Sequence, residues 1–223
     1  MEIVENLNTI KSSLKEGVKL VAVSKTKPAE DILLLYNNGH KVFGENKVQE
    51  LVDKYEKLPK DIEWHMIGHL QSNKVKYIAS FVELIHGVDS YKLLKIIDKE
   101  AKKYKRIVKC LLQIHIAEEE TKFGFDMQEI DQMLADREFI NLNSVKICGL
   151  MGMATFTDNY DVVRHEFKNL KKYFTQLKNN YFYNFDSFKE LSMGMSDDYP
   201  IAIEEGSTIV RIGSSIFGSR NYN

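Results

Sequence analysis

Apolar residues divide the chain into eight short runs, and most of the runs are followed by a segment with helical spacing. The runs that we expect to form strands span residues 18–23, 41–44, 63–68, 81–86, 107–116, 145–151, 189–192 and 208–212. Before the first run, Ile3, Leu7, Ile10 and Leu14 repeat with the period of an amphipathic helix. Eight strand and helix units with one additional helix at the amino end predict a (β/α)8 barrel of the TIM type. A doubly wound open sheet is the alternative, because a sequence pattern does not show whether a sheet closes.

The expected helices have apolar positions three and four residues apart. They cover residues 28–38, 45–56 and 75–79, and later ones begin at the cap pair Asp89 and Ser90, after Gly124 with Asp126 as the cap, at residue 160, and at Ser196. The helix after Ser90 is expected to present Leu94, Ile97, Ala101 and Tyr104 on one face, and the helix from residue 160 to present Tyr160, Val163, Phe167, Leu170, Phe174 and Leu177. A strand cannot satisfy either period, so these segments separate the strands.

The run at residues 18–23 is apolar at almost every position, which predicts a strand buried on both faces inside a parallel sheet. Lys25 follows at its carboxyl end, and Pro28 suits the first turn of the next helix because its missing N–H would have no partner there. Ligands of parallel α/β folds bind at the carboxyl ends of strands. Burial disfavours a charged ammonium and makes the amine a better nucleophile toward carbonyl compounds. Lys25 is therefore a Schiff-base candidate; the alternative is that it reaches solvent or pairs with a carboxylate.

Composition and charge narrow the class of protein. The chain has 223 residues, 43% of them apolar, with 31 basic and 32 acidic side chains and a formal net charge of −1. This balance gives no electrostatic reason to expect nucleic acid or a membrane as a partner. We find no signal peptide and no stretch near the roughly 20 apolar residues that span a bilayer, so we expect a cytoplasmic protein. No linker divides the chain, which predicts one domain over residues 1–223.

The cysteines and two of the histidines suggest no metal chemistry. Cys110 and Cys148 lie in apolar runs and are expected to be buried, reduced thiols. His65 and His69 have a spacing that could bind a metal, but no carboxylate or cysteine pattern accompanies them. We therefore expect no metal site, and expect these histidines to line or brace a pocket.

Two turns near the carboxyl end have the composition of an anion site. Gly194 and Ser196 precede the seventh helix, and Gly213, Ser214 and Ser215 follow the last strand. Such turns bring backbone N–H groups close to an anion, and barrel phosphate sites are often built after strands seven and eight. The pair predicts a phosphate site; the alternative is that the glycines serve only tight turns.

Arg211 lies inside the last apolar run, where a charged side chain is costly unless it has a partner. Its planar fork of donors would suit a heteroatom at the barrel mouth, and a structural pair with a glutamate is the alternative. A reactive lysine, a phosphate site and an inward arginine are together the parts that a pyridoxal phosphate site requires.

With these motifs, the chain resembles the pyridoxal phosphate homeostasis protein family, single-domain barrels related to the amino-terminal domain of bacterial alanine racemases. The matching segments are VAVSKTKP (21–28), FGENKVQE (43–50), WHMIGHLQSNK (64–74), KFGF (122–125), GLMGM (149–153), LSMGMSDD (191–198) and VRIGSSIFG (210–218). They run from the first expected strand to the last, so the resemblance covers nearly the whole chain.

The resemblance implies a role for seven residues in holding pyridoxal 5'-phosphate. Lys25 would carry the cofactor as a Schiff base, Ser196, Gly213 and Ser214 would hold its phosphate, Arg211 would face its ring nitrogen, and Asn46 and Met151 would border its ring. The sequence departs from the family at Lys47, where tyrosine is frequent, at His115, where asparagine is usual, and at Gly152 and Met153 in a variable loop. His115 could alter the hydrogen bonding of the pocket, and none of the departures is Lys25.

The expected function follows from the arginine. A guanidinium has no acceptor and stays charged, so the ring nitrogen must accept its hydrogen bond and remain unprotonated, which weakens the ring as an electron sink. A racemase also needs a second acid–base group, which in alanine racemase-like enzymes comes from a carboxyl-terminal domain that we do not expect here. We therefore expect a monomeric carrier that shelters pyridoxal phosphate and delivers it to apoenzymes, without turning over amino acids. The alternatives are a pyridoxal phosphate-dependent racemase or related enzyme, and a barrel that binds a phosphorylated metabolite with Lys25 as a countercharge.

Overall fold

The computed structural model describes residues 2–117 and 123–218, and its centre is a closed barrel of eight parallel strands. The strands follow one another around the barrel in chain order. They are β1 (Lys19–Val23), β2 (Val42–Glu45), β3 (Glu63–Met66), β4 (Leu84–Val88), β5 (Val108–Gln113), β6 (Val145–Met151), β7 (Glu190–Ser192) and β8 (Ile209–Ile212). β1 pairs with β8 from Lys19 opposite Ile209 to Ala22 opposite Ile212. This pairing closes the sheet, so the predicted (β/α)8 barrel is confirmed and the open-sheet alternative is wrong.

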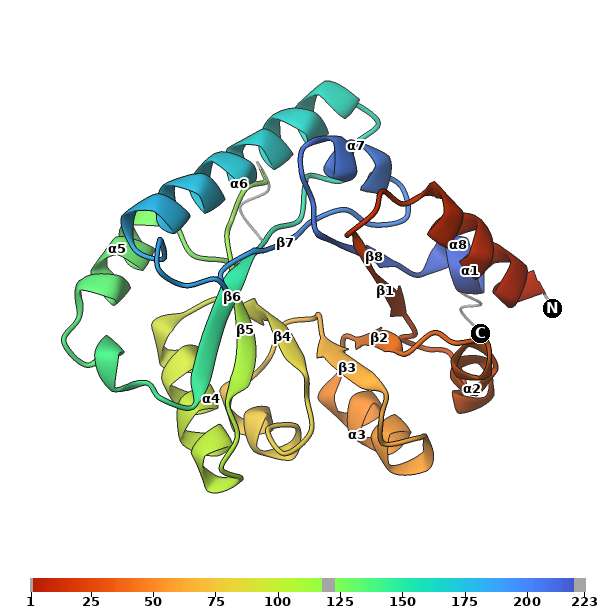
Figure 1. The fold of residues 1–223 in the computed structure, drawn as a ribbon, viewed down its shortest axis with the longest axis horizontal. Coiled ribbons are helices and arrows are strands. Elements are labelled where there is room, and N and C mark those ends of the chain that lie inside the picture. The colour runs from red at the N-terminus through yellow and green to blue at the C-terminus, as the bar shows by residue number, and fades with distance from the viewer. Residues whose placement is uncertain (1, 118–122, 219–223) are drawn as a thin grey trace.

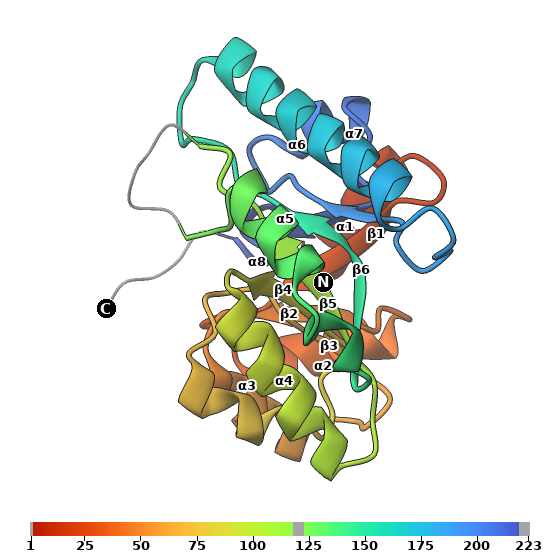
Figure 2. The same cartoon turned by 90° about the vertical axis from the view of Figure 1, so that its left-hand side faces the viewer.

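Helices surround the barrel (Figure 1). They are α1 (Glu2–Ser13), α2 (Ala29–Asn37), α3 (Val48–Lys57), α4 (Tyr91–Lys103), α5 (Met127–Ala135), α6 (Tyr160–Asn180), α7 (Tyr199–Glu204) and α8 (Ser214–Phe217), with two 3-10 helices, η1 (Ser72–Tyr77) and η2 (Phe139–Asn141). Figure 2 shows the strands between α6 and α7 on one side and α3 and α4 on the other. The additional helix α1 lies beside α8, where Asn6 Nδ2 donates to the carbonyl of Ile216 at 3.2 Å. The two ends of the described chain therefore support each other.

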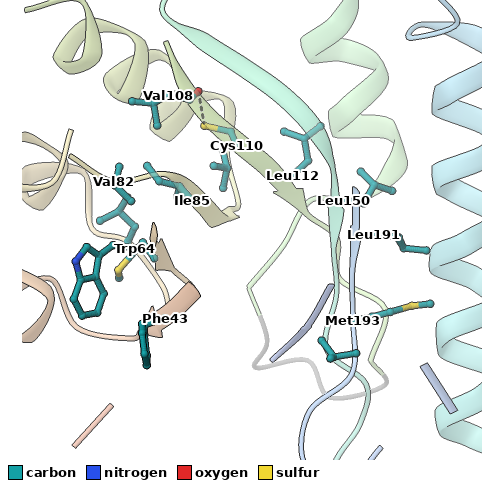
Figure 3. Packing of buried hydrophobic residues seen from close by; sticks show 14 of the residues in the cluster. Phe43, Trp64, Val82, Ile85, Val108, Cys110, Leu112, Leu150, Leu191 and Met193 are labelled. Carbon is teal, nitrogen blue, oxygen red and sulfur yellow. Dashed lines mark hydrogen bonds between the residues drawn. The ribbon is translucent and has the colours of Figure 1, made fainter. Parts of the chain in front are cut away.

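The alternation of side chains along each strand separates two cores. Leu20 and Ala22 of β1 belong to the large core between the strands and the helices, whereas Val21 and Val23 belong to a smaller cluster of residues from strands and strand ends. Successive side chains of a strand point to opposite faces, so the smaller cluster fills the inside of the barrel. Figure 3 shows part of the outer core, including Trp64. This two-sided burial is why the first run carries almost no polar residue.

Several local signals in the sequence are confirmed. Ser90 caps α4, because its side chain accepts a hydrogen bond from the backbone N–H of Leu93. Asp126 and Glu129 form a complete capping box at the start of α5. Cys110 and Cys148 are buried and free, and burial raises the pKa of both thiols.

Other boundaries differ from the prediction. The fourth strand is β4, three residues later than expected, because Arg106 donates to the carbonyls of Ala79 and Val82 and holds that segment as a turn. The segment expected as a helix at 75–79 is the 3-10 helix η1. Tyr104 and Tyr160 were expected on apolar faces but are 47% and 61% exposed, because each lies at a helix end where the phenol reaches solvent.

The positions of Pro28 and Ser196 relative to their helices also differ from the prediction. Pro28 precedes α2 at the N-cap position and is not in its first turn. Ser196 does not cap the seventh helix; α7 begins at Tyr199 with Asp198 before it, and the hydroxyl of Ser196 is used elsewhere, as described below.

None of the helices in the described part of the chain combines the length and the apolar character required to cross a membrane. Lys122 of the KFGF segment lies outside the described residues.

Candidate functional site

A cavity of about 280 Å³ lies at the carboxyl ends of the strands. Six of the seven residues singled out from the sequence line it: Lys25, Asn46, Ser196, Arg211, Gly213 and Ser214. They come from the ends of β1, β2, β7 and β8, which are brought together only by closure of the barrel. The cavity is therefore at the place where ligands bind in parallel barrels.

Lys25 continues the inward-facing register of β1. Val21 and Val23 point into the barrel, and Lys25 is the next residue of that alternation, partly buried at the cavity. The loop turns sharply at Thr26, which has a φ of 65°, a region that is uncommon for a β-branched residue. The backbone N–H of Thr26 donates to Glu50 Oε1 at 2.6 Å, and Lys27 Nζ donates to the carbonyl of Phe217 at 2.8 Å. The loop that presents Lys25 is thus attached to both α3 and α8.

A charged cluster under this loop, which we call the Lys54 cluster, consists of Ser24, Glu45, Glu50 and Lys54. Lys54 Nζ donates to Ser24 O, Glu45 Oε1 and Glu50 Oε1, each at 2.7 Å, and Ser24 Oγ donates to Glu45 Oε1 at 2.6 Å. Burial raises the pKa of Glu45 to about 7, although Lys54 and Ser24 act in the opposite direction. Glu45 Oε2 is buried and has no hydrogen-bond partner among the described residues. The cluster fixes the backbone of the residue immediately before Lys25.

The turns after β7 and β8 meet at Ser196. The backbone N–H of Gly213 and that of Ser215 both point at Ser196 Oγ, at 3.3 and 3.5 Å. The two turns are also joined because the N–H of Arg211 donates to Gly194 O at 3.0 Å. Gly194 has a φ of 94°, and a Cβ there would lie 2.6 Å from the side chain of Ala202, so only glycine fits. Converging N–H groups of this kind can hold a phosphate.

Arg211 lines the cavity from β8, and only 4% of it is exposed. Its Nη1 donates to Ser192 Oγ at 2.5 Å and its Nη2 donates to Gly152 O at 3.1 Å. Burial lowers the pKa of Arg211 to about 10, and the charge of Asp198 opposes this shift. The guanidinium therefore remains charged at neutral pH, and none of its hydrogen bonds to the described residues reaches a carboxylate. Within the described part of the chain, Arg211 forms no structural pair with a glutamate.

His65 and His86 extend this contact into the barrel. His86 Nδ1 lies 2.9 Å from Ser192 Oγ, and His86 Nε2 lies 3.0 Å from His65 Nδ1. His69 instead contacts Asp89 at 2.9 Å and stacks on Phe123. His65 in β3 and His69 shortly after it therefore contact different partners. Among residues 2–117 and 123–218, no three metal-binding side chains are grouped to hold an ion.

The remaining sequence-derived positions lie outside the cavity wall. Met151, the last residue of β6, is buried in the cluster inside the barrel, and Met153 and Phe156 of the loop after β6 line the cavity. Lys47 is exposed at the start of α3. His115 is not among the described residues that line the cavity. A contact of Met151 with a bound cofactor, and an effect of His115, stay predictions.

Some residues of the site were not predicted. Sequence reasoning missed the Lys54 cluster and the contacts of Ser192 and His86, and it did not single out Ile67, Phe156 or Met195, which also line the cavity. The one signal in the sequence that could have found the histidines is the alternation of inward and outward side chains along a strand, because His65 and His86 occupy inward positions of β3 and β4. No sequence pattern indicated which polar groups these histidines would meet.

Comparison with known proteins identifies the family. The sequence model for the alanine racemase N-terminal domain matches residues 2–221. The pyridoxal phosphate homeostasis protein of Aquifex aeolicus is 42% identical over 205 residues, covering 92% of this chain and 88% of that protein. The protein of the same name from Escherichia coli is 35% identical over 212 residues, covering 93% and 88%.

Solved structures agree with this family. PipY of Synechococcus elongatus with pyridoxal phosphate bound has a TM-score of 0.85 and 34% identity, and the match covers 97% of this chain and all of PipY. Alanine racemase from Bartonella henselae has a TM-score of 0.76 at 14% identity, and the match covers 98% of this chain and 58% of the racemase, which shows a shared fold alone. The resemblance predicted from the motifs is confirmed: the chain belongs to the pyridoxal phosphate homeostasis protein family, whose barrel is the alanine racemase N-terminal domain.

Proposed function

We propose that this protein binds pyridoxal 5'-phosphate, carries it as a Schiff base on Lys25, and serves cofactor homeostasis without turning over amino acids. The observation that carries the proposal is that one cavity contains Lys25, Arg211 and the turn at Gly213 and Ser214. The names of the curated relatives and the pyridoxal phosphate in the PipY structure support the choice of ligand.

The residues present fit the three polar parts of this molecule. The N–H groups of Gly213 and Ser215, which converge on Ser196 Oγ, suit the phosphate, and Lys27 adds positive charge to the same cavity. The buried guanidinium of Arg211 suits the ring nitrogen, since it offers only donors. When bound, the cofactor supplies an aldehyde for condensation with amines and a ring that withdraws electrons.

Lys25 forms the covalent bond in this proposal. Its neutral amine adds to the aldehyde carbon, and the two hydrogens of the nitrogen leave with the aldehyde oxygen as one water, so that a C=N bond replaces the C=O bond. The Lys54 cluster and the bonds of Thr26 and Lys27 hold the loop for this step. A fixed loop lowers the entropy that must be lost when the bond forms.

Arg211 also argues against amino-acid turnover. A donor-only group at the ring nitrogen keeps that nitrogen unprotonated, and the ring then stabilises a carbanion poorly. A racemase further requires an acid–base side chain on the face opposite the lysine. No tyrosine, histidine or cysteine is among the described residues that line the cavity; besides Lys25 and Arg211, its titratable side chains are Lys27, which bonds to Phe217 O, and Asp197.

The test is covalent trapping. The protein is incubated with pyridoxal phosphate, reduced with sodium borohydride, and examined by absorbance and peptide mass spectrometry. We expect an absorbance band of the Schiff base and an adduct on Lys25 that is absent from Lys25→Ala. Lys57→Ala is the control, because Lys57 is an exposed lysine of α3 that does not line the cavity, and it should retain the adduct.

Three results would contradict parts of the proposal. An adduct on another lysine overturns the role of Lys25. Turnover of L- or D-amino acids by the wild type that Lys25→Ala abolishes indicates the racemase alternative. Binding of phosphate esters without any Schiff base indicates the third function, in which Lys25 is only a countercharge.

We also propose that the protein acts as a monomer in the cytoplasm and delivers the cofactor to apoenzymes. The barrel is closed by strands of one chain, which supports the monomer, and two buried free thiols are typical of a reducing compartment. Gel filtration, and transfer of cofactor from the loaded protein to an apoenzyme whose activity reports it, test these points.

A further inference from the structure

Inside the barrel, four buried groups form a chain that begins at the cavity. Arg211 Nη1 donates to Ser192 Oγ, Ser192 Oγ contacts His86 Nδ1, and His86 Nε2 contacts His65 Nδ1, at 2.5, 2.9 and 3.0 Å. His65 and His86 are 1% and 0% exposed, and Ser192 is 0% exposed. They belong to β3, β4, β7 and β8, so the chain crosses the barrel interior. We call it the Arg211 relay.

The chemistry of arginine fixes the direction of the first hydrogen bond in the relay and favours one direction for the other two. A guanidinium has no acceptor, so Ser192 Oγ must accept from Arg211. The hydroxyl hydrogen of Ser192 then needs an acceptor, and His86 Nδ1 is its available partner among the described residues. A neutral His86 that accepts at Nδ1 carries its hydrogen on Nε2 and donates to His65 Nδ1. His65 therefore carries its own hydrogen on Nε2 as well.

The opposite direction is less favourable. If His86 Nδ1 donated to Ser192, the serine would accept twice and its hydroxyl hydrogen would be buried without an acceptor among the described residues. His65 Nε2 has no partner among these residues in either arrangement. The first direction thus leaves one unsatisfied polar group among these residues, the His65 Nε2–H, whereas the opposite direction leaves two, the Ser192 hydroxyl hydrogen and the acceptor at His65 Nε2. Burial lowers the pKa of His65 to about 3 and that of His86 well below its ordinary value, which agrees with two neutral rings.

We propose that His86 is a positioning residue for Arg211: through Ser192 it holds the guanidinium at the cavity as a charged donor, and His65 holds His86 in the required tautomer. None of the four groups of the relay is negatively charged, and although the charge of Asp198 acts on Arg211, no carboxylate of the described residues accepts a hydrogen bond from the guanidinium, so its donors can serve an acceptor in the cavity. This inference rests on the proposed function, because that acceptor is the ring nitrogen of pyridoxal phosphate.

The first test measures the tautomers in the protein without added cofactor, so it does not depend on the proposed function. Long-range ¹H–¹⁵N NMR at pH 7 distinguishes Nε2–H, Nδ1–H and charged imidazoles. We expect both His65 and His86 to be neutral Nε2–H tautomers, assigned with His65→Asn and His86→Asn. An Nδ1–H tautomer or a charged ring at either position overturns the relay.

The second test measures retention of pyridoxal phosphate in variants. Asparagine can place its amide oxygen near the position of Nδ1, so His86→Asn keeps an acceptor for Ser192, whereas His86→Leu and Ser192→Ala each remove a link to Arg211. We expect pyridoxal phosphate to be lost about tenfold faster from His86→Leu and from Ser192→Ala than from the wild type, with a shifted Schiff-base absorbance. His86→Asn should lose it at the rate of the wild type. His40→Asn is the control, because His40 is also buried but contacts Val42 O at the other end of the barrel.

The outcomes are separable. Wild-type retention in His86→Leu, or no rescue by asparagine, contradicts the positioning role. If His86→Leu does not fold, Ser192→Ala and His86→Asn make the same comparison. If the wild-type protein binds no pyridoxal phosphate, the proposed function fails, and the NMR result still decides whether the relay exists.

Discussion

Two buried cations of this barrel have opposite surroundings. Lys54 lies outside the strands and donates to two carboxylates, Glu45 and Glu50, at 2.7 Å each. Arg211 lies inside the barrel and donates to a hydroxyl and a backbone carbonyl, both neutral. Both side chains are less than 9% exposed, so burial alone does not separate them.

The difference in hydrogen-bond partners indicates different roles for the charges of Lys54 and Arg211. A buried cation with carboxylate partners is already compensated by the protein, and its removal leaves an uncompensated anion. A buried cation whose hydrogen-bond partners are all neutral is compensated less, and for Arg211 the nearby charge of Asp198 acts without a hydrogen bond. We infer that the Lys54 cluster supports the fold of the Lys25 loop, whereas Arg211 serves ligand binding. The following predictions test this division.

The largest effect is expected from Lys54→Met. It leaves Glu45 buried without its cation, and breaking a buried pair in this way costs about 3–5 kcal/mol of folding free energy. Urea unfolding at pH 8 measures it. Lys57→Met, on an exposed position of the same helix, is the control and should change stability by about 0.5 kcal/mol or less. A loss below about 1 kcal/mol in Lys54→Met would contradict the structural role.

The next effect is the pH dependence that Glu45 gives to stability. Its pKa in the folded protein is raised to about 7 from an ordinary 4.5, so the folded state binds the proton more tightly than the unfolded state. The resulting stabilisation is complete below pH 4.5 and is lost as the pH rises through 7. We expect the wild type to lose on the order of 3 kcal/mol from this group between pH 5 and 8. Glu45→Gln should flatten that part of the urea-unfolding profile, and an unchanged profile would argue against it.

Arg211→Met should behave differently from Lys54→Met. Removal of a buried charge that has no carboxylate among its hydrogen-bond partners offsets the loss of its two hydrogen bonds, so the stability of the protein without cofactor should change by about 1 kcal/mol or less. The additional stability that saturating pyridoxal phosphate gives to the wild type should disappear. Urea unfolding with and without the cofactor measures both quantities. A cofactor-independent loss as large as that of Lys54→Met would mean that Arg211 is structural.

The smallest effect is expected at the phosphate turn. Ser196→Ala removes the acceptor for the N–H groups of Gly213 and Ser215, which should lower stability by about 1 kcal/mol and weaken pyridoxal phosphate binding several-fold. Ser215→Ala is the matched control, since only its backbone N–H contacts Ser196. Equal binding by the two variants, in an absorbance titration, would exclude a role of the Ser196 hydroxyl.

The sequence was informative wherever the cause is local. The apolar run of β1 predicted a strand buried on both faces, and the register Val21, Val23, Lys25 directed the lysine inward. Ser90 and Asp126 cap helices through bonds that span three residues, which explains why they were recognised. The cap predicted at Ser196 failed for the opposite reason, because its hydroxyl is engaged by a turn 17 residues away.

The sequence by itself determined the eight units, the position of Lys25 at the end of β1 and the small-residue turns, because these depend on periodicity and on neighbours in the chain. Only the tertiary structure decided that β1 pairs with β8, that Lys54 stands under the Lys25 loop, and that Arg211 meets Ser192 and, through it, His86. Ser192 and His86 are 106 residues apart in sequence. A hydrogen bond requires two groups within about 3 Å, and closure of the barrel is what brings such distant groups to that separation.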